Sequence, residues 1–390
     1  GLNQTYRELQ DLAFRHLKPW RYSVLSKAVA RARQRRRDLI QKVQQDLERA
    51  LSEAGLADAY CYTGKPEARL VFDPNDGQMM NWFLQLYSAS QAAAQKRHNF
   101  RLEHDGVMFR AKRTLTVNGW ELALRALPKD APNLGQLAMP HAWRELMMDP
   151  DLLAGGLVLI TATNGQGKTT HASAAVVSRL LRYAGFGVTV EDPPELNLQQ
   201  WIGEGRCNQI PVDTPPGAQP GSGFAEALIG ARRYFPAMTG GGTVLFIGEI
   251  RNAETAAETL LAANEGHLVI ATFHASSIQN ALMRLISMAS DKLGKEQARE
   301  ALAATLKMCI YQRLLLKDEG TMWERGQYIG DLLWSPGAES QVGEELLNFD
   351  MKSVMKRVQA QSVALGRFSE GARPRLADLR DALRNAKSGA

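Results

Sequence analysis

The stretch that decides the fold is GLVLITATNGQGKTTHASAAVVSRLLR, residues 156–182. It opens with an apolar run typical of a buried strand, continues with a glycine-rich turn over 162–169, and ends in a helical pattern. The turn matches the pattern G-x-x-x-x-G-K-[S/T], with Ala162 in place of the first glycine. Backbone N–H groups in such a turn point toward a phosphate, and the positive end of the helix dipole adds to the attraction. The segment therefore predicts a phosphate-binding loop (P-loop) rather than an ordinary glycine-rich turn.

The P-loop residues have separate expected roles. Gly165 and Gly167 let the backbone approach the phosphate without a Cβ in the way, and Lys168 reaches the β- and γ-phosphates. Thr169 is the expected Mg²⁺ ligand, so ATP and Mg²⁺ are the expected cofactors. Ala162 matters little if its φ is ordinary, but a positive φ there costs about 1–2 kcal/mol. The expected nucleotide-binding residues of the loop are Asn164, Gly165, Gln166, Gly167, Lys168, Thr169 and Thr170.

Strands and helices alternate downstream of the P-loop. The apolar runs GLVLIT, FGVTVE, TVLFIG and HLVIATF alternate with helical patterns over 168–184, 252–264 and 277–290. This rhythm is typical of an α/β fold with a parallel sheet covered by helices on both faces. At 390 residues the chain is long enough for two domains. The expected divisions are a helical segment over 1–67, a small α+β domain over 68–127, a linker over 128–155, the α/β domain over 156–334 and a helical region over 335–390.

The N-terminal part has two features of its own. Residues 5–54 have a helical pattern that contains five arginines between Arg31 and Arg37, either a solvated face or a docking surface for an acidic partner or membrane. Segments after residue 68 alternate apolar and polar residues, and Asp105-Gly106 is the expected turn of a hairpin.

Acidic residues follow two of the predicted strands. Glu249 comes directly after TVLFIG, while Glu191, Asp192 and Glu195 end or follow FGVTVE. Ligands of an open parallel sheet bind outside the carboxyl ends of its strands, so these acids should lie beside the P-loop. There they would hold the water shell of Mg²⁺ and orient the attacking water. Each acid alone has a plainer interpretation as a helix cap.

Histidines and arginines complete the set of candidates. His267 precedes and His274 follows the strand LVIATF, and His274 is the better placed of the two to sense a γ-phosphate. Arg232 and Arg233 end a helical segment before the Glu249 strand. An arginine that reaches a γ-phosphate can be worth ~10³–10⁵ in rate, although a surface pair is the plainer interpretation.

Taken together, these motifs resemble the superfamily of type II and type IV secretion ATPases, most nearly its PilT-like and DotB-like members. TATNGQGKTT resembles the Walker A loop of that family, and VTVEDPPEL resembles its acidic "Asp box". TVLFIGEIRNAETAAETLLAANEGHLVIATFHASS resembles its Walker B and His boxes, and ALRALPKDAPNLGQLAMPHAWRELM resembles its linker region. The resemblance covers residues 98–316, and its motifs occur in the family's order.

The resemblance implies a fold, an assembly and residue roles. It implies a homo-hexameric ring whose subunits have a PAS-like N-terminal domain and a RecA-like P-loop ATPase core, with ATP at the seam between them. Glu249 and Glu195 then activate or position water, and Arg233 falls on the arginine that precedes the family's Walker B box. Glu191, His274 and His267 stay expected catalytic residues from their own positions beside the strands. Arg110 and Arg125 fall where the family's N-terminal domain supplies arginines to the nucleotide.

This sequence also departs from the family. Gly248 stands where other P-loop proteins have an aspartate, as in the family itself, but TGGG at 239–242 replaces the family's acidic turn. The paired-cysteine metal module of pilus-extension and type II secretion members is missing, and the C-terminal tail motif of retraction motors is not evident. Extension, retraction and secretion therefore stay open.

Charge and composition limit the remaining alternatives. A formal charge of +6 permits contact with anionic lipid or nucleic acid without favouring either. The three cysteines form no metal or disulfide pattern, which favours a reducing compartment. The main hypothesis is a cytoplasmic motor ATPase, peripheral at the inner membrane, that acts on a platform protein of a pilus or of a secretion or conjugation apparatus, with no direct nucleic-acid partner. The alternatives are a RecA-like nucleic-acid translocase and a nucleotide-gated scaffold without turnover.

Overall fold

The structure is a computed structural model of the chain. It describes residues 59–60, 69–70, 85, 89–90, 99–104, 106–116, 119–127, 130–212, 223–235, 243–315, 327–368 and 374–386. The predicted helix over 5–54, the arginines within it and most of the predicted helix over 78–96 lie outside these residues, as do Asp105 and the whole turn 239–242. Contacts divide the chain into one unit of residues 1–93 and 111–125 and another of 94–110 and 126–390. The predicted domain boundaries stay predictions.

An eight-stranded sheet forms the centre of the second unit, in the order β13-β12-β6-β11-β10-β7-β9-β8. Its parallel strands are β12 (Leu306–Leu315), β6 (Gly156–Ala162), β11 (Leu268–His274), β10 (Val244–Ile247), β7 (Phe186–Glu191) and β9 (Gly205–Pro211). The edge strands β13 (Gln327–Trp334) and β8 (Trp201–Ile202) run antiparallel to their neighbours. The predicted parallel sheet is confirmed, and β6 is an interior strand of it, between β12 and β11.

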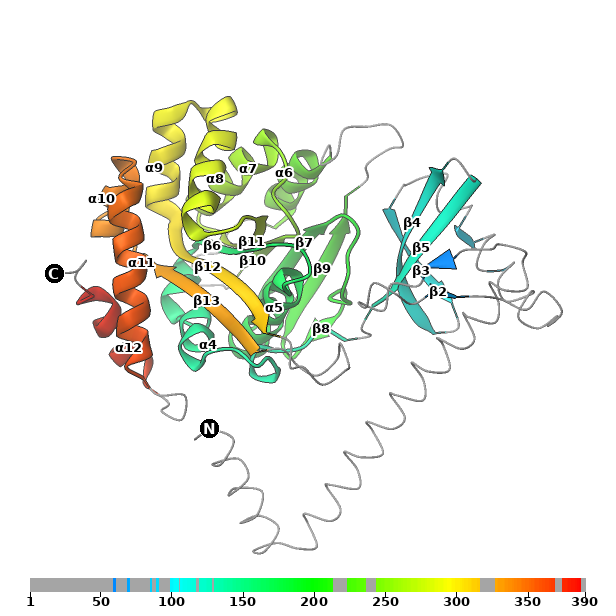
Figure 1. Cartoon of the computed structure of the whole chain (residues 1–390), viewed down its shortest axis with the longest axis horizontal. Helices are drawn as coiled ribbons and strands as arrows, with labels where there is room; N and C mark the ends of the chain where they lie inside the picture. Colours follow the sequence, from blue (N-terminus) through cyan, green and yellow to red (C-terminus); the bar gives the residue numbers. More distant parts are fainter. Residues whose placement is uncertain are drawn as a thin grey trace, which may run out of the picture. The chain divides into compact units, whose positions relative to one another are not determined.

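Helices pack on both faces of this sheet (Figure 1). One face packs against α4 (His141–Met147), the 3-10 helix η2 (Pro150–Ala154), α5 (Lys168–Tyr183) and α12 (Leu376–Arg384). The other packs against α6 (Phe224–Tyr234), α7 (Ala253–Asn264), α8 (Ile278–Leu293), α9 (Lys295–Thr305), α10 (Gln341–Leu347) and α11 (Met351–Gly366). The predicted helices over 168–184, 252–264 and 277–290 correspond to α5, α7 and α8.

Strand β6 contributes side chains to both of the cores that this arrangement creates. Leu157 and Leu159 point into one core and Val158 and Ile160 into the other, because side chains alternate along a strand. All four are fully buried, and burying each is worth about 1.5–3 kcal/mol. The strand before the P-loop is therefore held rigidly from both faces.

Side-chain caps begin several of the helices that follow the strands. The Asn252 side chain accepts a hydrogen bond from the Thr255 N–H at 2.9 Å, and Ser277 caps α8 in the same way through the Asn280 N–H at 3.1 Å. Such caps satisfy backbone donors that the first turn of a helix leaves free. They define where the chain turns away from the sheet after β10 and β11.

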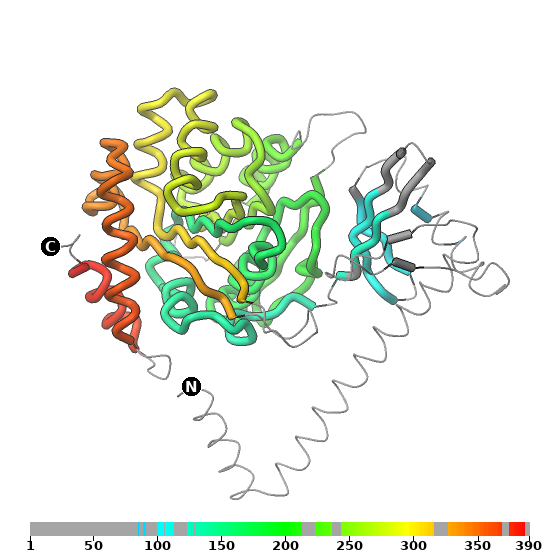
Figure 2. The backbone as a smooth tube through the Cα atoms, viewed as in Figure 1, coloured from blue at the N-terminus to red at the C-terminus, as the bar shows by residue number. Residues whose placement is uncertain are grey.

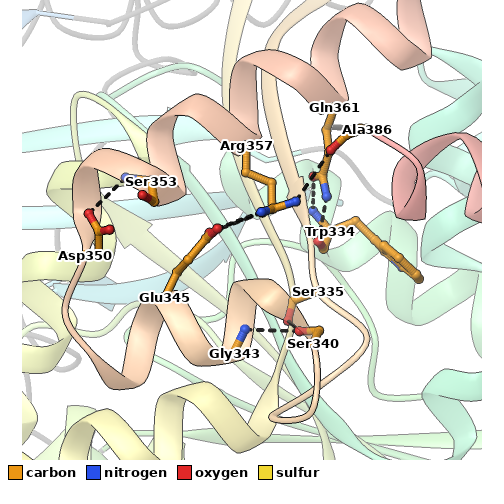
Figure 3. Close-up of polar contacts among 10 residues, drawn as sticks. All are labelled: Trp334, Ser335, Ser340, Gly343, Glu345, Asp350, Ser353, Arg357, Gln361 and Ala386. Carbon is orange, nitrogen blue, oxygen red and sulfur yellow. Dashed lines mark hydrogen bonds and ion pairs between the residues drawn. The ribbon is translucent and has the colours of Figure 1, made fainter. Parts of the chain in front are cut away.

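The expected helical tail is confirmed and is held by buried polar contacts (Figure 3). The Arg357 guanidinium on α11 forms an ion pair with Glu345 on α10, with Nη2 and Oε1 2.7 Å apart. The Gln361 side chain accepts from the Trp334 N–H at 2.8 Å and donates to the Trp334 carbonyl at 2.9 Å. It thus pairs with the outer edge of β13 as a further strand would. No helix within the described residues is both long enough and apolar enough to cross a membrane.

A three-stranded sheet precedes the large one along the chain (Figure 2). Its strands are β3 (Asn99–His104), β4 (Val107–Thr116) and β5 (Gly119–Ala126), in that order. Phe100, Phe109 and Leu124 are buried there, which fits the alternating pattern of the sequence. Gly106, between β3 and β4, has φ +73°, the backbone conformation that the predicted turn favours at glycine.

Candidate active site

The P-loop connects β6 to α5 at the carboxyl edge of the large sheet. Gly165 and Gly167 have φ of +74° and +75°, so both need the conformational freedom of glycine. A Cβ on Gly167 would also lie 2.8 Å from the hydroxyl oxygen of Tyr328 on β13. Ala162 is the buried last residue of β6 and is not among the residues of positive φ, so alanine is accommodated there without strain.

Lys168 begins α5 and points back across the loop. Its Nζ donates to the carbonyl oxygens of Ala162 and Thr163, at 3.0 and 2.9 Å. Partial burial lowers the pKa of Lys168, and the carboxylates of Glu249 and Glu195 oppose that shift. The predicted acids are therefore close enough to this amine to affect its charge. Around it the loop offers exposed Asn164 and Gly165 and, partly buried, Gln166, Gly167, Thr169 and Thr170.

Glu249 and Asp192 lie at the same edge and share an arginine. Glu249 follows β10 directly, and its Oε2 accepts from the Nε of Arg251 at 2.6 Å. Nη1 of the same arginine lies 3.5 Å from Oδ2 of Asp192, which follows β7. Parallel pairing of β10 with β7 brings the two acids together as predicted. Arg251 was not among the predicted residues, although a lone basic residue two positions after Glu249 was a signal for it.

Glu191, the last residue of β7, is buried beside Gly248. It accepts hydrogen bonds from the Thr189 hydroxyl at 2.6 Å and the Gln209 amide at 3.0 Å. Burial raises the pKa of this carboxyl, and the two hydrogen bonds oppose the shift. A Cβ on Gly248 would lie only 3.1 Å from the Cγ of Glu191. The missing aspartate at 248 thus leaves room for a carboxylate from the neighbouring strand.

Glu195 forms an ion pair with Arg110, which belongs to the same contact unit. The Glu195 side chain is mostly buried, and Arg110 is partly exposed on β4. Two residues predicted from different motifs therefore meet directly. Arg125 is exposed on β5 and belongs to the other contact unit.

The two predicted histidines lie at opposite ends of β11. His274 pairs in register with Ala162 at the P-loop edge, and its Nδ1 is buried with no hydrogen-bond partner among the described residues. His267 precedes the strand at the amino edge. Its Nδ1 lies 3.1 Å from the Ala262 carbonyl and its Nε2 lies 2.9 Å from the Phe235 carbonyl. A strand advances about 3.3 Å per residue, so the structure does not bring His267 to the P-loop of its own subunit.

Arg233 also lies at the amino edge. The end of α6 is located there by the contact between the Phe235 carbonyl and His267, and by ion pairs of Arg232 with Glu258 and Glu265. Arg233 itself is exposed. It is therefore separated from the P-loop of its own chain by the length of the sheet.

Two polar residues behind the P-loop were not among the predicted ones. Gln312 on β12 and His171 on α5 are completely buried, and Gln312 contacts the loop. The sequence carried a signal for Gln312, because it is a polar residue within the apolar run MCIYQRLLL. Nothing in the local pattern distinguished His171 from other helix residues.

Comparisons with known proteins agree with this geometry. A family model described as type II/IV secretion system protein matches residues 91–328. The uncharacterized protein YggR of Escherichia coli is 34% identical over 207 residues, 52% of this chain and 57% of that protein. The type IV pilus ATPase PilU of Pseudomonas aeruginosa is 28% identical over 267 residues, 68% of this chain and 64% of that protein. This chain thus spans less than two thirds of either relative.

Solved structures give the same fold. The crystal structure of the pilus retraction motor PilT with bound ADP matches with a TM-score of 0.59 and 25% identity, covering 80% of this chain and 85% of that one. The ATPase DotB of Legionella pneumophila matches with a TM-score of 0.55 and 21% identity, over 80% and 84%. The predicted α/β fold and the predicted likeness to PilT-like and DotB-like proteins are confirmed.

Proposed function

This chain belongs to the family of type II/IV secretion system proteins, and from that premise we propose that it hydrolyses ATP as the motor of a type IV pilus or of a type IV secretion or conjugation apparatus. The observation that carries the proposal is that the candidate residues gather at one edge of the large sheet. The P-loop, Lys168 and the acids after β7 and β10 lie there together, with opposite charges close enough to affect the pKa of the lysine.

The residues at this edge fit ATP and Mg²⁺. Two glycines of positive φ leave the loop free of Cβ atoms on its exposed side, and nothing lies within 4 Å of where a Cβ of Gly165 would be. Lys168 supplies a cation, and Thr169 supplies a hydroxyl on the first turn of α5. Glu191, Asp192 and Glu249 supply the oxygens that Mg²⁺ and its water shell prefer. When bound, Mg²⁺ would neutralise charge on the phosphates.

We assign the activation of water to Glu249. It is half-buried and accessible to a water molecule, whereas Glu191 is fully buried and its Oε1 already accepts hydrogen bonds from Thr189 and Gln209. Glu191 is therefore better suited to hold the water shell of a cation. Arg251 holds the Glu249 carboxylate in its present direction through the 2.6 Å contact. Glu195, paired with Arg110, has the position of a second acid that orients water. His274 lies on the strand beside the P-loop, and its buried Nδ1 has no hydrogen-bond partner within the described part of the chain, so it is the candidate sensor of the γ-phosphate.

Arg233 would act in a neighbouring subunit. Its exposure at the amino edge excludes contact with its own P-loop but suits a residue that reaches a nucleotide across a subunit seam. His267 lies at the same edge but is buried with both ring nitrogens against backbone carbonyls, so this reasoning does not extend to it. The action of Arg233 across a seam requires the closed homo-hexamer that we propose, in which Arg110 and Arg125 would supply further positive charge. A cytoplasmic location, peripheral at the inner membrane and against a platform protein of the apparatus, belongs to the same proposal.

The Glu249→Gln variant tests the catalytic assignment. It should retain ATP binding while turnover falls by about 10² or more, the scale of losing one positioned base. Glu345→Gln is the matched control, because Glu345 is also an acid paired with an arginine but lies on α10, away from the P-loop. Equal turnover in Glu249→Gln and Glu345→Gln would remove the assignment. Single-stranded DNA distinguishes the alternative function, because it would stimulate the turnover of a nucleic-acid translocase. We expect it to leave the ATP turnover of this protein unchanged.

Mixing two inactive variants tests whether Arg233 acts in the site of a neighbouring subunit. In a mixed ring, an Arg233→Ala subunit keeps its own Lys168 and receives Arg233 from a Lys168→Ala neighbour, so some sites become complete. Lys168→Ala mixed with Glu249→Gln is the control, because both groups belong to one subunit's site and no mixture completes it. Absence of rescue in the first mixture at every ratio would contradict the action of Arg233 across the seam.

A further inference from the structure

A chain of buried side chains connects the P-loop to the neighbouring strand β12. Gln312 is fully buried, and its Nε2 donates to the backbone carbonyl of Gln166 at 2.6 Å. The Gln166 side chain in turn accepts from the Leu314 N–H at 2.7 Å. Parallel pairing of β12 with β6 places Tyr311 beside Thr161, so Gln312 lies at the level where β6 ends and the loop begins. The middle of the P-loop is thus attached to the sheet at two points.

The hydrogen-bond directions follow from the groups involved. A carbonyl oxygen can only accept, so the nitrogen of the Gln312 amide must face Gln166 and its oxygen must face the other way. That oxygen lies 2.7 Å from Nδ1 of His171. His171 must therefore carry its proton on Nδ1 and donate it to Gln312. The same arrangement leaves Nε2 of His171 buried and with no hydrogen-bond partner among the described residues.

Aromatic rings hold His171 in this orientation. The ring of Trp143 lies parallel to the imidazole at a centroid distance of 6.5 Å, and the ring of Tyr328 meets it edge-on at 5.9 Å. Complete burial lowers the pKa of His171 to about 4, so the ring is neutral at physiological pH. A neutral Nδ1–H tautomer is the one that the contact with Gln312 requires.

Holding the Gln166 carbonyl also determines where the next N–H points. The peptide bond between Gln166 and Gly167 is trans and planar, so its C=O and N–H point in opposite directions. With the carbonyl held by β12 on one side, the Gly167 N–H is directed away from β12. Gly167 has no side chain and a positive φ, so without that attachment its peptide plane would be free to rotate.

We propose that Gln312, held by His171, is a positioning residue that aims the Gly167 N–H of the P-loop at the bound phosphate. The proposal rests on the nucleotide-binding function proposed above and extends it to two residues that do not touch the nucleotide. Its energetic basis is that a backbone N–H contributes to phosphate binding only if it is already directed at the anion.

The test compares Gln312→Leu with Gln361→Leu. Both glutamines are buried and each makes hydrogen bonds to a backbone, but Gln361 pairs with Trp334 in the C-terminal helical region (Figure 3). Both variants should lower the melting temperature, since both leave buried backbone groups without partners. Only Gln312→Leu should weaken binding of ADP to the purified protein, by about tenfold or more, the scale of losing one charge-assisted hydrogen bond. Equal ADP affinity in the two variants would overturn the proposal.

A second variant separates positioning from general stability. His171→Phe keeps an aromatic ring against Trp143 and removes both the donor to Gln312 and the unpaired Nε2. The loss of the donor leaves the buried Gln312 oxygen unpaired, and removal of the unpaired Nε2 offsets that cost. We therefore expect little change in melting temperature while ADP binding weakens by several-fold, a combination that a merely structural role would not produce. A fall in melting temperature with unchanged ADP affinity would count against His171. This variant also supplies the answer if Gln312→Leu does not fold.

Hydrogen exchange separates this proposal from the proposed function. Amide exchange across residues 163–171 and at Leu314 should be faster in Gln312→Leu than in Gln361→Leu, with or without nucleotide. A wild-type protein that binds neither ADP nor ATP would refute the proposed function, and exchange would still decide whether Gln312 orders the loop. Unchanged exchange in Gln312→Leu would show that it does not.

Discussion

Placing an aspartate at position 248 should destabilise this protein. Gly248 follows β10 where other P-loop proteins have an acid, and its φ is not positive, so the backbone itself accepts any residue. The obstacle is Glu191, because a Cβ at 248 would lie 3.1 Å from its Cγ and 3.2 Å from its Cα. Glu191 is buried, and its carboxylate occupies the neighbourhood that an aspartate side chain would enter.

The expected cost can be divided between size and charge. The Gly248→Ala variant adds only the tight Cβ contact, for which we expect about 1 kcal/mol, at the low end of overpacking costs. Gly248→Asn adds the volume of the larger side chain, and Gly248→Asp adds the same volume with a charge. Two carboxylates about 4 Å apart repel by ~4 kcal/mol at an effective dielectric constant of 20. Proton uptake by one of them limits this, so we expect Asp to be about 2–3 kcal/mol less stable than Asn at pH 8.

Urea unfolding at pH 8 and pH 5 measures this difference. Burial already raises the pKa of Glu191, so its ionisation costs stability as the pH rises from the unfolded pKa through the folded one. A second carboxylate raises that pKa further, and the gap between Asp and Asn should therefore shrink at pH 5, where one proton is shared by the pair. Equal stability of Asp and Asn at pH 8, or a gap that widens at pH 5, would refute the reasoning.

The contacts in the structure predict the outcome of three other changes, one of pH and two of sequence, on stability or ADP binding. Between pH 6.5 and pH 4 the free energy of unfolding of the wild type, measured with urea, should fall by about 3 kcal/mol relative to that of His171→Phe. The reason is that the folded pKa of His171, about 4, lies below its unfolded value of 6.5, and each pH unit between them is worth about 1.4 kcal/mol. Gly167→Ala should weaken ADP binding at least about tenfold, because φ is +75° there and the new Cβ would lie 2.8 Å from the Tyr328 hydroxyl. Adding Tyr328→Phe should recover part of the lost ADP affinity, as measured by calorimetry. Arg357→Met should cost about 3–5 kcal/mol in urea unfolding because it leaves Glu345 buried and unpaired, and adding Glu345→Met should recover most of that loss.

The elements predicted correctly are those whose signal is local. GLVLIT and TVLFIG are continuous apolar runs with strong turn signals after them, and both became fully buried central strands. Strand β9, with the sequence GRCNQIP, was not predicted because most of its side chains are only partly buried and its pattern is mixed. It is held in the sheet by pairing with β7, from Phe186 with Arg206 to Glu191 with Pro211. Such pairing depends on a neighbour that the local pattern does not identify.

The positions of the candidate residues were likewise predictable where a local pattern determines them. The acids after β7 and β10 were expected together because parallel strands end at one edge, and they are together. The separation of His267 from His274 was also accessible, because seven residues of extended chain span about 23 Å. His267 was nevertheless kept among the expected catalytic residues. Arg233 was ambiguous for a different reason, since the direction of α6 relative to the sheet depends on contacts such as that of Phe235 with His267.

Gln312 shows what kind of information the sequence lacks. It lies 146 residues from Gln166 along the chain, and their contact exists only because the chain crosses from β11 through two helices to pair β12 with the far side of β6. Its polar side chain in an apolar strand indicated that a partner must exist, since a buried amide without hydrogen bonds costs about 1–3 kcal/mol. Which partner it finds depends on strand order, and strand order depends on the packing of the whole sheet. A buried polar residue can therefore be recognised from sequence as significant before its role can be known, and its partner in the fold then indicates that role.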